Sequence, residues 1–296
     1  MRTRQDRHLH HLEKIVTFAA LAAMLMLGIG FAQAKAPAAE GEQLLLRSSV
    51  ALVQDAASGE TLYAKNQDAP VPIASITKLM TALVVLERKL DLTQRVVISD
   101  QDYDTLKGTR SRLRPGSVLT RDELMLLALM SSENRAAAAL ARTFPGGTGA
   151  FIAAMNVKAR ALGMTDSRFV DSSGLSPGNV SSARDLVRLI EAAHRHPVIR
   201  EYSTRESARV KVFGREQGFR NTNGLVRSAN WEIGLSKTGY ISEAGRCLVM
   251  HVRVASRELI VVLLDSWGKH SRVGDANRIR KWLETHAAKG PASQPG

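Results

Sequence analysis

The hydrophobic period changes along the 296-residue chain, and this change restricts the fold more than any other feature of the sequence. Residues 50–65, VALVQDAASGETLYAK, form two apolar-rich runs around a turn at Ala57-Ser58-Gly59, which predicts a strand hairpin. Helical spacing of apolar residues then dominates to about residue 207. Four later runs are strand-like and are separated by polar or glycine-containing turns: ARVKVF, GLSKTGYIS, CLVMHVRVAS and ELIVVLLDS. This order of elements predicts an α+β sandwich, with an antiparallel sheet flanked by helices.

Capping signals locate several of the predicted helices. Thr120 and Glu123 form a capping box before an apolar run. Ser182 with Asp185 marks the start of another helix, which we expect to end before Pro197. Two more helices are predicted over residues 150–162 and 271–286.

The first 34 residues are typical of an export signal peptide. They contain a positively charged start, a 17-residue apolar run from Ile15 to Phe31 and the small-residue site Ala32-Gln33-Ala34. The alternative is an uncleaved anchor, although about 17 residues is the lower limit for crossing a bilayer. We expect cleavage, so the chain is predicted to act in the periplasm. Residues 45–287 are predicted to form one catalytic-sized domain, and residues 288–296 a disordered tail without an anchor.

The formal net charge of +13 suits a polyanionic partner. An anionic cell-wall polymer or acidic lipid headgroups are compatible with export. Nucleic acid is a poor candidate, because aromatic residues make up only 5% of the chain and no basic-aromatic motif is present. A basic surface without a specific partner remains an alternative. The single cysteine, Cys247, excludes an intramolecular disulfide and is expected to pack as a small apolar side chain.

Three short motifs carry candidate chemistry. Ser75 and Lys78 lie three residues apart in PIASITKLMTALVVLERKL, on one face of a predicted apolar helix. Alone, the pair fits either a solvated lysine or a nucleophile with its base. Ser132 and Asn134 form an S-x-N triplet between two helical runs, where capping is the simplest role. Lys237-Thr238-Gly239 lies inside a strand, where a glycine often marks a close approach to the backbone.

In this order, the three motifs match those of the penicillin-binding serine DD-peptidases, which act on peptidoglycan, and the chain resembles that family. The resemblance covers nearly all of residues 45–287. Within the family, the chain is similar to the low-molecular-mass members, above all the D-alanyl-D-alanine endopeptidases. It is carried by the segments IASITKLMTALVVLE, LMSSENRAAAALA, LGMTDSRFVDSSGLSPGNVSSARDL and GLSKTGYISEAGRCLVM.

The resemblance implies a role for each motif residue. Ser75 would be the nucleophile and Lys78 its base, which requires a neutral amine. We expect burial and the charge of Lys237 to lower the pKa of Lys78. Ser132 would relay a proton to the leaving amine, and Asn134 would bind the substrate's peptide chain.

The third motif would bind the substrate's carboxylate and carbonyl groups. Lys237 would supply positive charge and Thr238 would hold the substrate carboxylate, with Gly239 beside them. The backbone N–H groups of Ser75 and Tyr240 would form the oxyanion hole. Arg272 is either a second carboxylate clamp or an ordinary arginine at a helix start.

Other residues are poorer candidates. Gly174 to Gly178, GLSPG, fits the nucleophile-elbow pattern around Ser176, but no strand leads into it and Pro177 follows the serine. Glu133 is expected to face solvent or to support its loop. His194 and His196 are two residues apart and do not share a helical face, so no metal site is predicted, and no cofactor is implied.

The sequence leaves several functions open. A DD-endopeptidase that cuts D-alanyl cross-links of peptidoglycan is favoured. A D-alanyl-D-alanine carboxypeptidase, a β-lactamase and a non-catalytic wall-binding relative are the alternatives. The intact motifs argue against a non-catalytic protein. β-Lactams are expected to be covalent inhibitors that leave slowly, because no E-x-x-L-N segment follows Asn134 to support fast deacylation.

Overall fold

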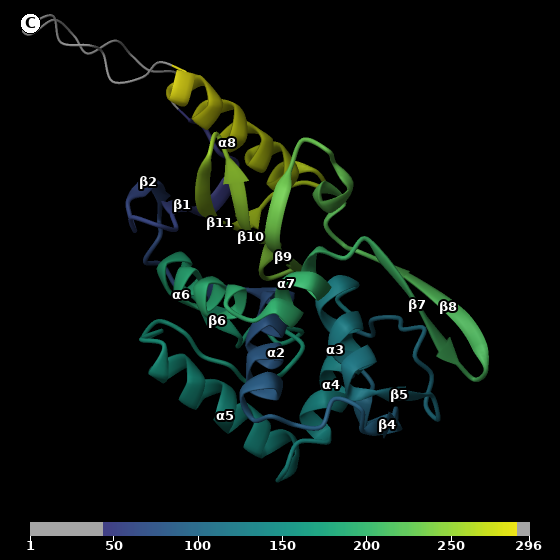
Figure 1. The fold of residues 1–296 in the computed structure, drawn as a ribbon. Helices are drawn as coiled ribbons and strands as arrows, with labels where there is room; N and C mark the ends of the chain where they lie inside the picture. Colours follow the sequence, from purple (N-terminus) through teal and green to yellow (C-terminus); the bar gives the residue numbers. More distant parts are fainter. Residues whose placement is uncertain (1–43, 289–296) are drawn as a thin grey trace, which may run out of the picture. The chain divides into compact units, whose positions relative to one another are not determined.

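The computed structural model describes residues 44–288, and its central element is a five-stranded antiparallel sheet in the order β2-β1-β11-β10-β9 (Figure 1). The strands of this sheet are β1 (Ser48–Asp55), β2 (Thr61–Lys65), β9 (Glu232–Ile241), β10 (Gly245–Val254) and β11 (Arg257–Ser266). The N-terminal hairpin joins the C-terminal meander through β1 and β11, with Ser48 opposite Ser266. The predicted α+β fold is confirmed.

Both faces of the sheet are covered, which explains why its strands are nearly continuous apolar runs. In β1, Val50 and Leu52 belong to the larger core, whereas Ala51 and Val53 belong to the smaller core on the opposite face, as the alternation of a strand requires. Helix α8 (Ser271–Ala288) covers the smaller core, and α6 (Ala183–His194) lies against the larger one (Figure 1).

The larger core continues into a helical layer built around the buried helix α2. Its elements are η1 (Ala74–Thr77), α2 (Lys78–Glu87), η2 (Asp100–Asp102), α3 (Arg121–Met130), α4 (Asn134–Arg142), α5 (Gly147–Ala161), α6 and α7 (Pro197–Thr204). Two predicted caps are confirmed. The Thr120 hydroxyl accepts from the Glu123 N–H at 3.1 Å, and the Ser182 hydroxyl accepts from the Asp185 N–H at 3.2 Å. These caps fix where α3 and α6 begin.

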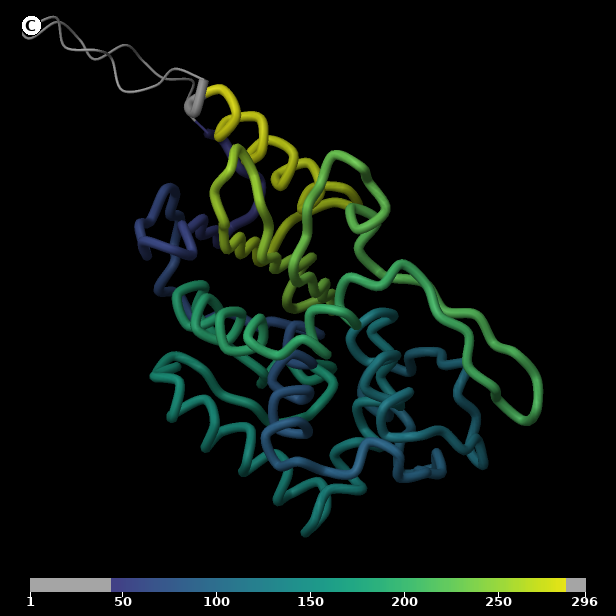
Figure 2. The backbone as a smooth tube through the Cα atoms, in the orientation of Figure 1, coloured from purple at the N-terminus to yellow at the C-terminus, as the bar shows by residue number. Residues whose placement is uncertain are grey.

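One prediction is confirmed and another differs from the structure. The helix capped by Ser182 ends at His194, before Pro197. Pro197 itself begins α7, because a proline at the first helical position gives up no hydrogen bond. The run ARVKVF does not join the central sheet. Within residues 44–288, strand β7 (Ser207–Val212) pairs only with β8 (Arg215–Arg220), in a separate hairpin (Figures 1 and 2).

The remaining short elements brace the helical layer. They are the antiparallel pairs β3 (Val71–Pro72) with β6 (Val180–Ser181) and β4 (Arg95–Val97) with β5 (Val118–Thr120), together with the turn η3 (Gly224–Arg227). Pairing of β3 with β6 ties the chain just before η1 to the segment that follows the loop at residues 171–179.

The predicted signal peptide, residues 1–34, lies outside the described residues. Helix α8 runs to Ala288, the first residue of the predicted tail, and residues 289–296 are also outside them. Within residues 44–288, every helix is too short or too polar to span a bilayer.

Candidate active site

Ser75 lies in the 3-10 turn η1, at the bottom of a cleft. Among the residues from Ile73 to Met80, Ser75 alone is partly exposed, and all the rest are buried. The preceding residue, Ala74, has a φ of +47°, a left-handed conformation that costs an alanine roughly 1–2 kcal/mol. Strained backbone of this kind concentrates at functional sites, because the surrounding structure must hold it in place.

Two glycines hold this turn from opposite sides. A Cβ on Gly174 would lie 1.9 Å from the carbonyl oxygen of Ala74. A Cβ on Gly239 in β9 would lie 2.9 Å from the carbonyl oxygen of Ile73 and 3.1 Å from the amide nitrogen of Ser75. The glycine of the K-T-G motif therefore allows strand β9 to approach the backbone of Ser75, as its position in a strand suggested.

Lys78, the first residue of α2, is fully buried and points at Ser75. Its Nζ lies 3.0 Å from the Ser75 Oγ, 2.7 Å from the Asn134 Oδ1 and 2.6 Å from the Ser173 carbonyl oxygen. The last two groups can only accept hydrogen bonds. A neutral amine has two N–H donors and one lone pair. With both donors used on Asn134 and Ser173, the lone pair is left for the Ser75 hydroxyl.

Burial lowers the pKa of Lys78 to about 7, against the opposing effect of the Asp171 and Glu133 carboxylates. The charge of Lys237, which we expected to contribute, is not among the causes of this shift. Lys237 is itself buried, and burial together with the charges of Lys78 and Arg272 lowers its own pKa well below the usual range. Near neutral pH, a substantial fraction of Lys78 is therefore in the neutral form that can accept a proton.

Ser132 occupies the turn between α3 and α4, opposite Ser75. It is partly exposed, and its φ of +58° is again left-handed. The Lys237 Nζ donates to the Ser132 Oγ at 2.9 Å and to the carbonyl oxygen of Thr238 at 2.8 Å. Each of the two buried lysines is thus paired with one partly exposed serine hydroxyl.

Strand β9 forms one wall of the site and is the edge strand of the sheet. Only alternate residues of an antiparallel pair bond to the partner strand, so an edge strand leaves free N–H groups on its outer side. Tyr240 is 57% exposed and lies over the cleft. The Thr238 hydroxyl is 2.6 Å from the hydroxyl of Thr222, which fixes its orientation.

Arg272 is the second residue of α8, and its side chain contacts the sheet. Its Nη1 donates to the carbonyl oxygens of Gly239 at 2.9 Å and Cys247 at 3.2 Å. Burial lowers its pKa, and the charge of Arg246 contributes. The guanidinium is therefore hydrogen-bonded to the sheet beside the K-T-G motif, and Arg272 lines the wall of the cleft.

These residues surround one pocket of about 540 Å³. It brings together Ser75, Ser132, Asn134, Thr238, Gly239, Tyr240 and Arg272, with the two lysines buried directly behind the hydroxyls. Lys107, Thr109 and Thr222 also line it, and no local signal in the sequence pointed to them. Thr109 accepts from the Asn134 Nδ2 at 3.0 Å, which orients that amide.

Three other sequence candidates take structural roles. The Ser176 hydroxyl accepts from the Gly178 N–H at 3.1 Å in a turn, so the nucleophile-elbow interpretation is wrong. Glu133 does not face solvent. It is 9% exposed and its side chain accepts from the Arg135 N–H, which caps α4. Cys247 is completely buried, and burial raises the pKa of its thiol to about 12, as expected of a packing residue.

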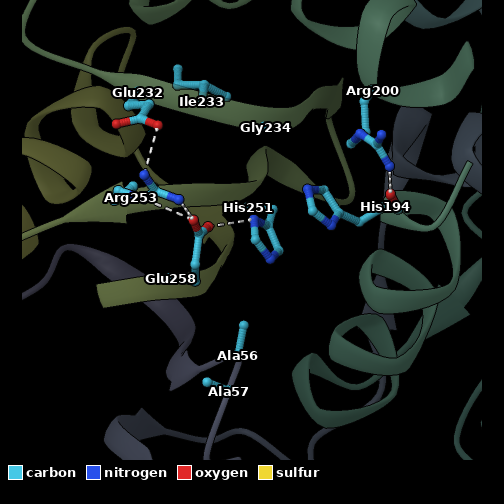
Figure 3. A pocket seen from close by; sticks show the side chains of 10 residues that line it. All are labelled: Ala56, Ala57, His194, Arg200, Glu232, Ile233, Gly234, His251, Arg253 and Glu258. Carbon is cyan, nitrogen blue, oxygen red and sulfur yellow. Dashed lines mark hydrogen bonds and ion pairs between the residues drawn. The ribbon is translucent and has the colours of Figure 1, made fainter. Parts of the chain in front are cut away.

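A second pocket, of about 460 Å³, lies beside the start of β9 (Figure 3). The rings of His194 and His251 stack there with centroids 3.7 Å apart. Its other polar side chains are those of Arg200, Glu232, Arg253 and Glu258. Among residues 44–288, no hydroxyl or thiol lines this pocket. No group of three or more His, Cys, Asp or Glu side chains within residues 44–288 could hold a metal ion.

A turn that presents a serine, a buried lysine behind it, and the S-x-N and K-T-G motifs define a penicillin-binding type of serine peptidase site. The family of D-alanyl-D-alanine carboxypeptidases matches residues 35–268, and the chain belongs to this family of serine hydrolases. The predicted resemblance is confirmed.

Two relatives are similar over most of their length. The chain is 49% identical over 242 residues to a D-alanyl-D-alanine endopeptidase of Pseudomonas aeruginosa, covering 81% of this chain and 78% of the relative. It is 44% identical over 268 residues to a D-alanyl-D-alanine endopeptidase of Escherichia coli, covering 88% and 86%.

Solved structures show the same fold. The crystal structure of a Streptomyces DD-transpeptidase matches with a TM-score of 0.75 and 27% identity, over 81% of this chain and 98% of that one. A penicillin-binding protein homolog of Mycobacterium tuberculosis matches with a TM-score of 0.76 and 28% identity, over 87% and 98%.

Proposed function

We propose that this protein is a serine DD-endopeptidase, which hydrolyses D-alanyl cross-links of peptidoglycan through an acyl-enzyme on Ser75. The observation that carries this proposal is the set of contacts around Lys78. Two acceptors occupy its donors and leave the lone pair to the nucleophile, and its pKa is lowered to about 7.

Acylation would begin with transfer of the Ser75 hydroxyl proton to the neutral Lys78. The Ser75 oxygen attacks the D-alanyl carbonyl carbon, and the carbonyl oxygen becomes negatively charged. The N–H groups of Ser75 and Tyr240 would stabilise this oxyanion more strongly than the uncharged carbonyl of the substrate. The C–N bond then breaks, and the proton held by Lys78 would pass through the Ser132 hydroxyl to the leaving amine, so that Lys78 is neutral again. The Ser132 hydroxyl also contacts the Lys237 Nζ at 2.9 Å.

The substrate would be held by groups on both walls of the cleft. Asn134 would bind the peptide chain on the helical side. Thr238, Lys237 and Arg272 would bind a carboxylate beside the scissile bond on the sheet side. Water then hydrolyses the Ser75 ester, with Lys78 as the base. This second step returns the enzyme to its starting state without a cofactor.

The endopeptidase assignment rests on the relatives. Those at 49% and 44% identity are named endopeptidases, whereas a carboxypeptidase of Escherichia coli is 31% identical. A diaminopimelate-type cross-link offers the site a D-centre with a free carboxylate next to the scissile amide. The same Thr238 and Arg272 contacts would therefore serve either bond. We also propose export to the periplasm and covalent inhibition by β-lactams, because the same hydroxyl would attack a β-lactam amide.

The decisive experiment compares two substrates side by side. Wild-type protein and Ser75→Ala are incubated with a cross-linked tetrapeptide dimer and with a pentapeptide monomer, and products are identified by mass. We expect the wild type to convert the dimer into monomers, and Ser75→Ala to convert neither substrate. Rapid loss of terminal D-alanine from the monomer, with the dimer intact, would instead identify a carboxypeptidase.

Covalent labelling tests the nucleophile separately. After reaction with a fluorescent penicillin, peptide mapping should place the adduct on the peptide that contains Ser75. We expect this adduct to persist, because no glutamate lines the pocket within residues 44–288 to activate a water for rapid release. An adduct on Ser176 would overturn the assignment of the nucleophile.

A further inference from the structure

Two segments beside the cleft carry almost only positive charge. The loop of residues 105–116 contains Lys107, Arg110, Arg112 and Arg114 and no acidic residue. The β7–β8 hairpin, residues 207–220, contains Arg209, Lys211, Arg215 and Arg220 and one acidic residue, Glu216. We call these eight basic residues the basic arm. Surfaces that serve solubility alone mix charges of both signs, whereas a one-signed surface attracts polyanions.

The two segments form one surface. The Arg112 Nη1 donates to the Gly218 carbonyl oxygen at 2.5 Å, and its guanidinium lies 4.1 Å from the centroid of the Phe219 ring. Gly116 packs beside the ring of Phe213, which sits at the tip of the hairpin. The hairpin projects from the helical layer with the loop beside it (Figures 1 and 2).

The charges of the arm are exposed and mostly uncompensated. All eight basic residues are exposed. Among the described residues, two of them form an ion pair: Arg209 with Glu216 at 3.6 Å, and Lys107 with Glu243 at 2.5 Å. The other six have no acidic partner within residues 44–288. Their mutual repulsion is a cost that folding alone does not require, which points to a ligand of opposite charge.

The arm begins at the rim of the cleft. Lys107 and Thr109 in the loop line the catalytic pocket, and so does Thr222, two residues after the hairpin ends. Thr222 also contacts the Thr238 hydroxyl of the K-T-G motif. The basic side chains therefore start beside the cleft, where they could reach the parts of a polymer that flank a bound segment.

We infer that the basic arm binds the carboxylate-rich peptide stems that flank the cross-link in polymeric peptidoglycan. This inference rests on the proposed function and extends it from the scissile bond to the surrounding polymer. Each stem of a diaminopimelate-type peptide carries free carboxylates, so an insoluble wall presents many anions to the arm at once. An acidic membrane is a weaker candidate, because a flat surface seated on the arm would also cover the rim of the cleft.

The test separates binding from chemistry with two matched variants of the full chain. The arm variant carries Arg209→Gln, Lys211→Gln and Arg215→Gln. The control variant carries Arg88→Gln, Lys89→Gln and Arg160→Gln, which removes the same charge from exposed residues at the ends of α2 and α5. Co-sedimentation with intact peptidoglycan sacculi is measured in a Ser75→Ala background, so that the polymer is not digested.

We expect the arm variant to bind sacculi at least about tenfold more weakly than the control variant at low salt. About 0.5 M salt should remove this difference, because it shortens the screening length to a few ångströms. With Ser75 restored, both variants should cleave a soluble cross-linked dimer and react with penicillin at the wild-type rate, since the substituted residues lie outside the pocket.

Three outcomes overturn parts of the argument separately. Equal binding of sacculi by both variants would refute the role of the arm. Co-sedimentation with phosphatidylglycerol vesicles is measured for the same two variants. If the arm variant lost binding to these vesicles but kept its binding to sacculi, the partner would be a membrane and not the peptide stems. Failure of the wild type to cleave the soluble dimer would refute the proposed function, whereas an arm-dependent loss of sacculus binding would still support the polymer contact.

Discussion

Two pairs of basic side chains lie beside strand β9, and only one of them contacts hydroxyl groups. Lys78 and Lys237 lie beside the middle of the strand, where their nitrogens are 3.0 and 2.9 Å from serine hydroxyls. His194 and His251 lie beside the start of the strand, stacked on each other (Figure 3). Burial is the main cause of the lowered pKa in both pairs, with values of about 7 for Lys78 and about 4 for His251.

The two pairs differ in the groups that they face, although burial lowers the pKa in both. The histidines face a carboxylate and backbone instead of a hydroxyl. The His251 Nδ1 is 3.4 Å from the Glu258 carboxylate, and the His194 Nε2 occupies the space that a Cβ on Gly234 would need. Their stack joins the end of α6 to β10, at the point where the pairing of β10 with β9 shifts register. The histidine pair thus has a packing role, whereas each nitrogen of the lysine pair contacts a serine hydroxyl.

The largest effect is expected from Lys78→Arg. Arginine keeps the charge but stays protonated, so it cannot accept the Ser75 proton. Because nucleophile and base act as a unit, we expect acylation by a fluorescent penicillin to slow by at least about a thousandfold. His251→Gln is the matched change in the other pair and should acylate at the wild-type rate. Near-normal acylation by a folded Lys78→Arg protein would remove Lys78 from the role of base.

The pH dependence of acylation should follow the lysine pair and not the histidine pair. Lys78 acts only when neutral, so the rate should be highest above a pH of about 7 and fall roughly tenfold per unit below it. Stopped-flow acylation from about pH 5 to pH 8 measures this. His251→Gln should show the same profile. A rate that stays flat across this range would contradict a base with this pKa.

Substitution of alanine for Gly239, beside the lysine pair, and for Gly234, beside the histidine pair, should have unequal effects on acylation. In Gly239→Ala the new Cβ meets backbone atoms of Ile73 and Ser75, which cannot move away, so we expect acylation to fall by about tenfold or more. In Gly234→Ala it meets the end of the His194 side chain, at 2.9 Å. We expect this variant to lose about 1 kcal/mol of stability and to keep its acylation rate. Equal losses of activity would mean that the two glycines have the same role.

The smallest effect is a change in acid stability. The pKa of His251 is lowered from 6.5 to about 4 by burial, then by the charges of His194 and Arg200, while Glu258 opposes the shift. Between these values the unfolded chain binds a proton that the folded chain excludes, so stability falls as pH falls. We expect the free energy of unfolding to decrease by about 2 kcal/mol between pH 7 and pH 5 through this group. Urea unfolding should show that His251→Gln lacks this component of the decrease.

The parts of the fold that could be predicted depend on local signals. The capping pairs at Thr120 and Ser182 lie within one helical turn, and the alternating apolar faces of β1 and β11 lie within one strand. The separate β7–β8 hairpin was missed because its sequence is compatible with any antiparallel strand. Only tertiary packing decides that β7 pairs with β8 and not with a strand of the central sheet.

The candidate site was predictable where motif residues face the substrate and not where other segments support them. Ser75, Lys78 and the K-T-G residues were recognised by type and order. The Ser173 carbonyl contacts Lys78 from 95 residues away, and any residue could supply that oxygen. Thr222 and Thr109 likewise hold site residues through single hydroxyl contacts. Such long-range contacts carry no pattern in the sequence, because a shared fold and not a period brings them together.

The ion pair between Lys107 and Glu243 joins the loop on one wall of the cleft to the β9–β10 turn on the other, and this link has a topological consequence. A short peptide has a free end and can be threaded beneath a closed link. A cross-link in a wall is tied to polymer on both sides and has no end to thread. A cross-link that passes under the link can therefore enter only from the side, when the link is open. Opening of this ion pair would therefore be needed to bind a cross-link within the wall but not to bind a short soluble peptide, although the same bond is cut in both.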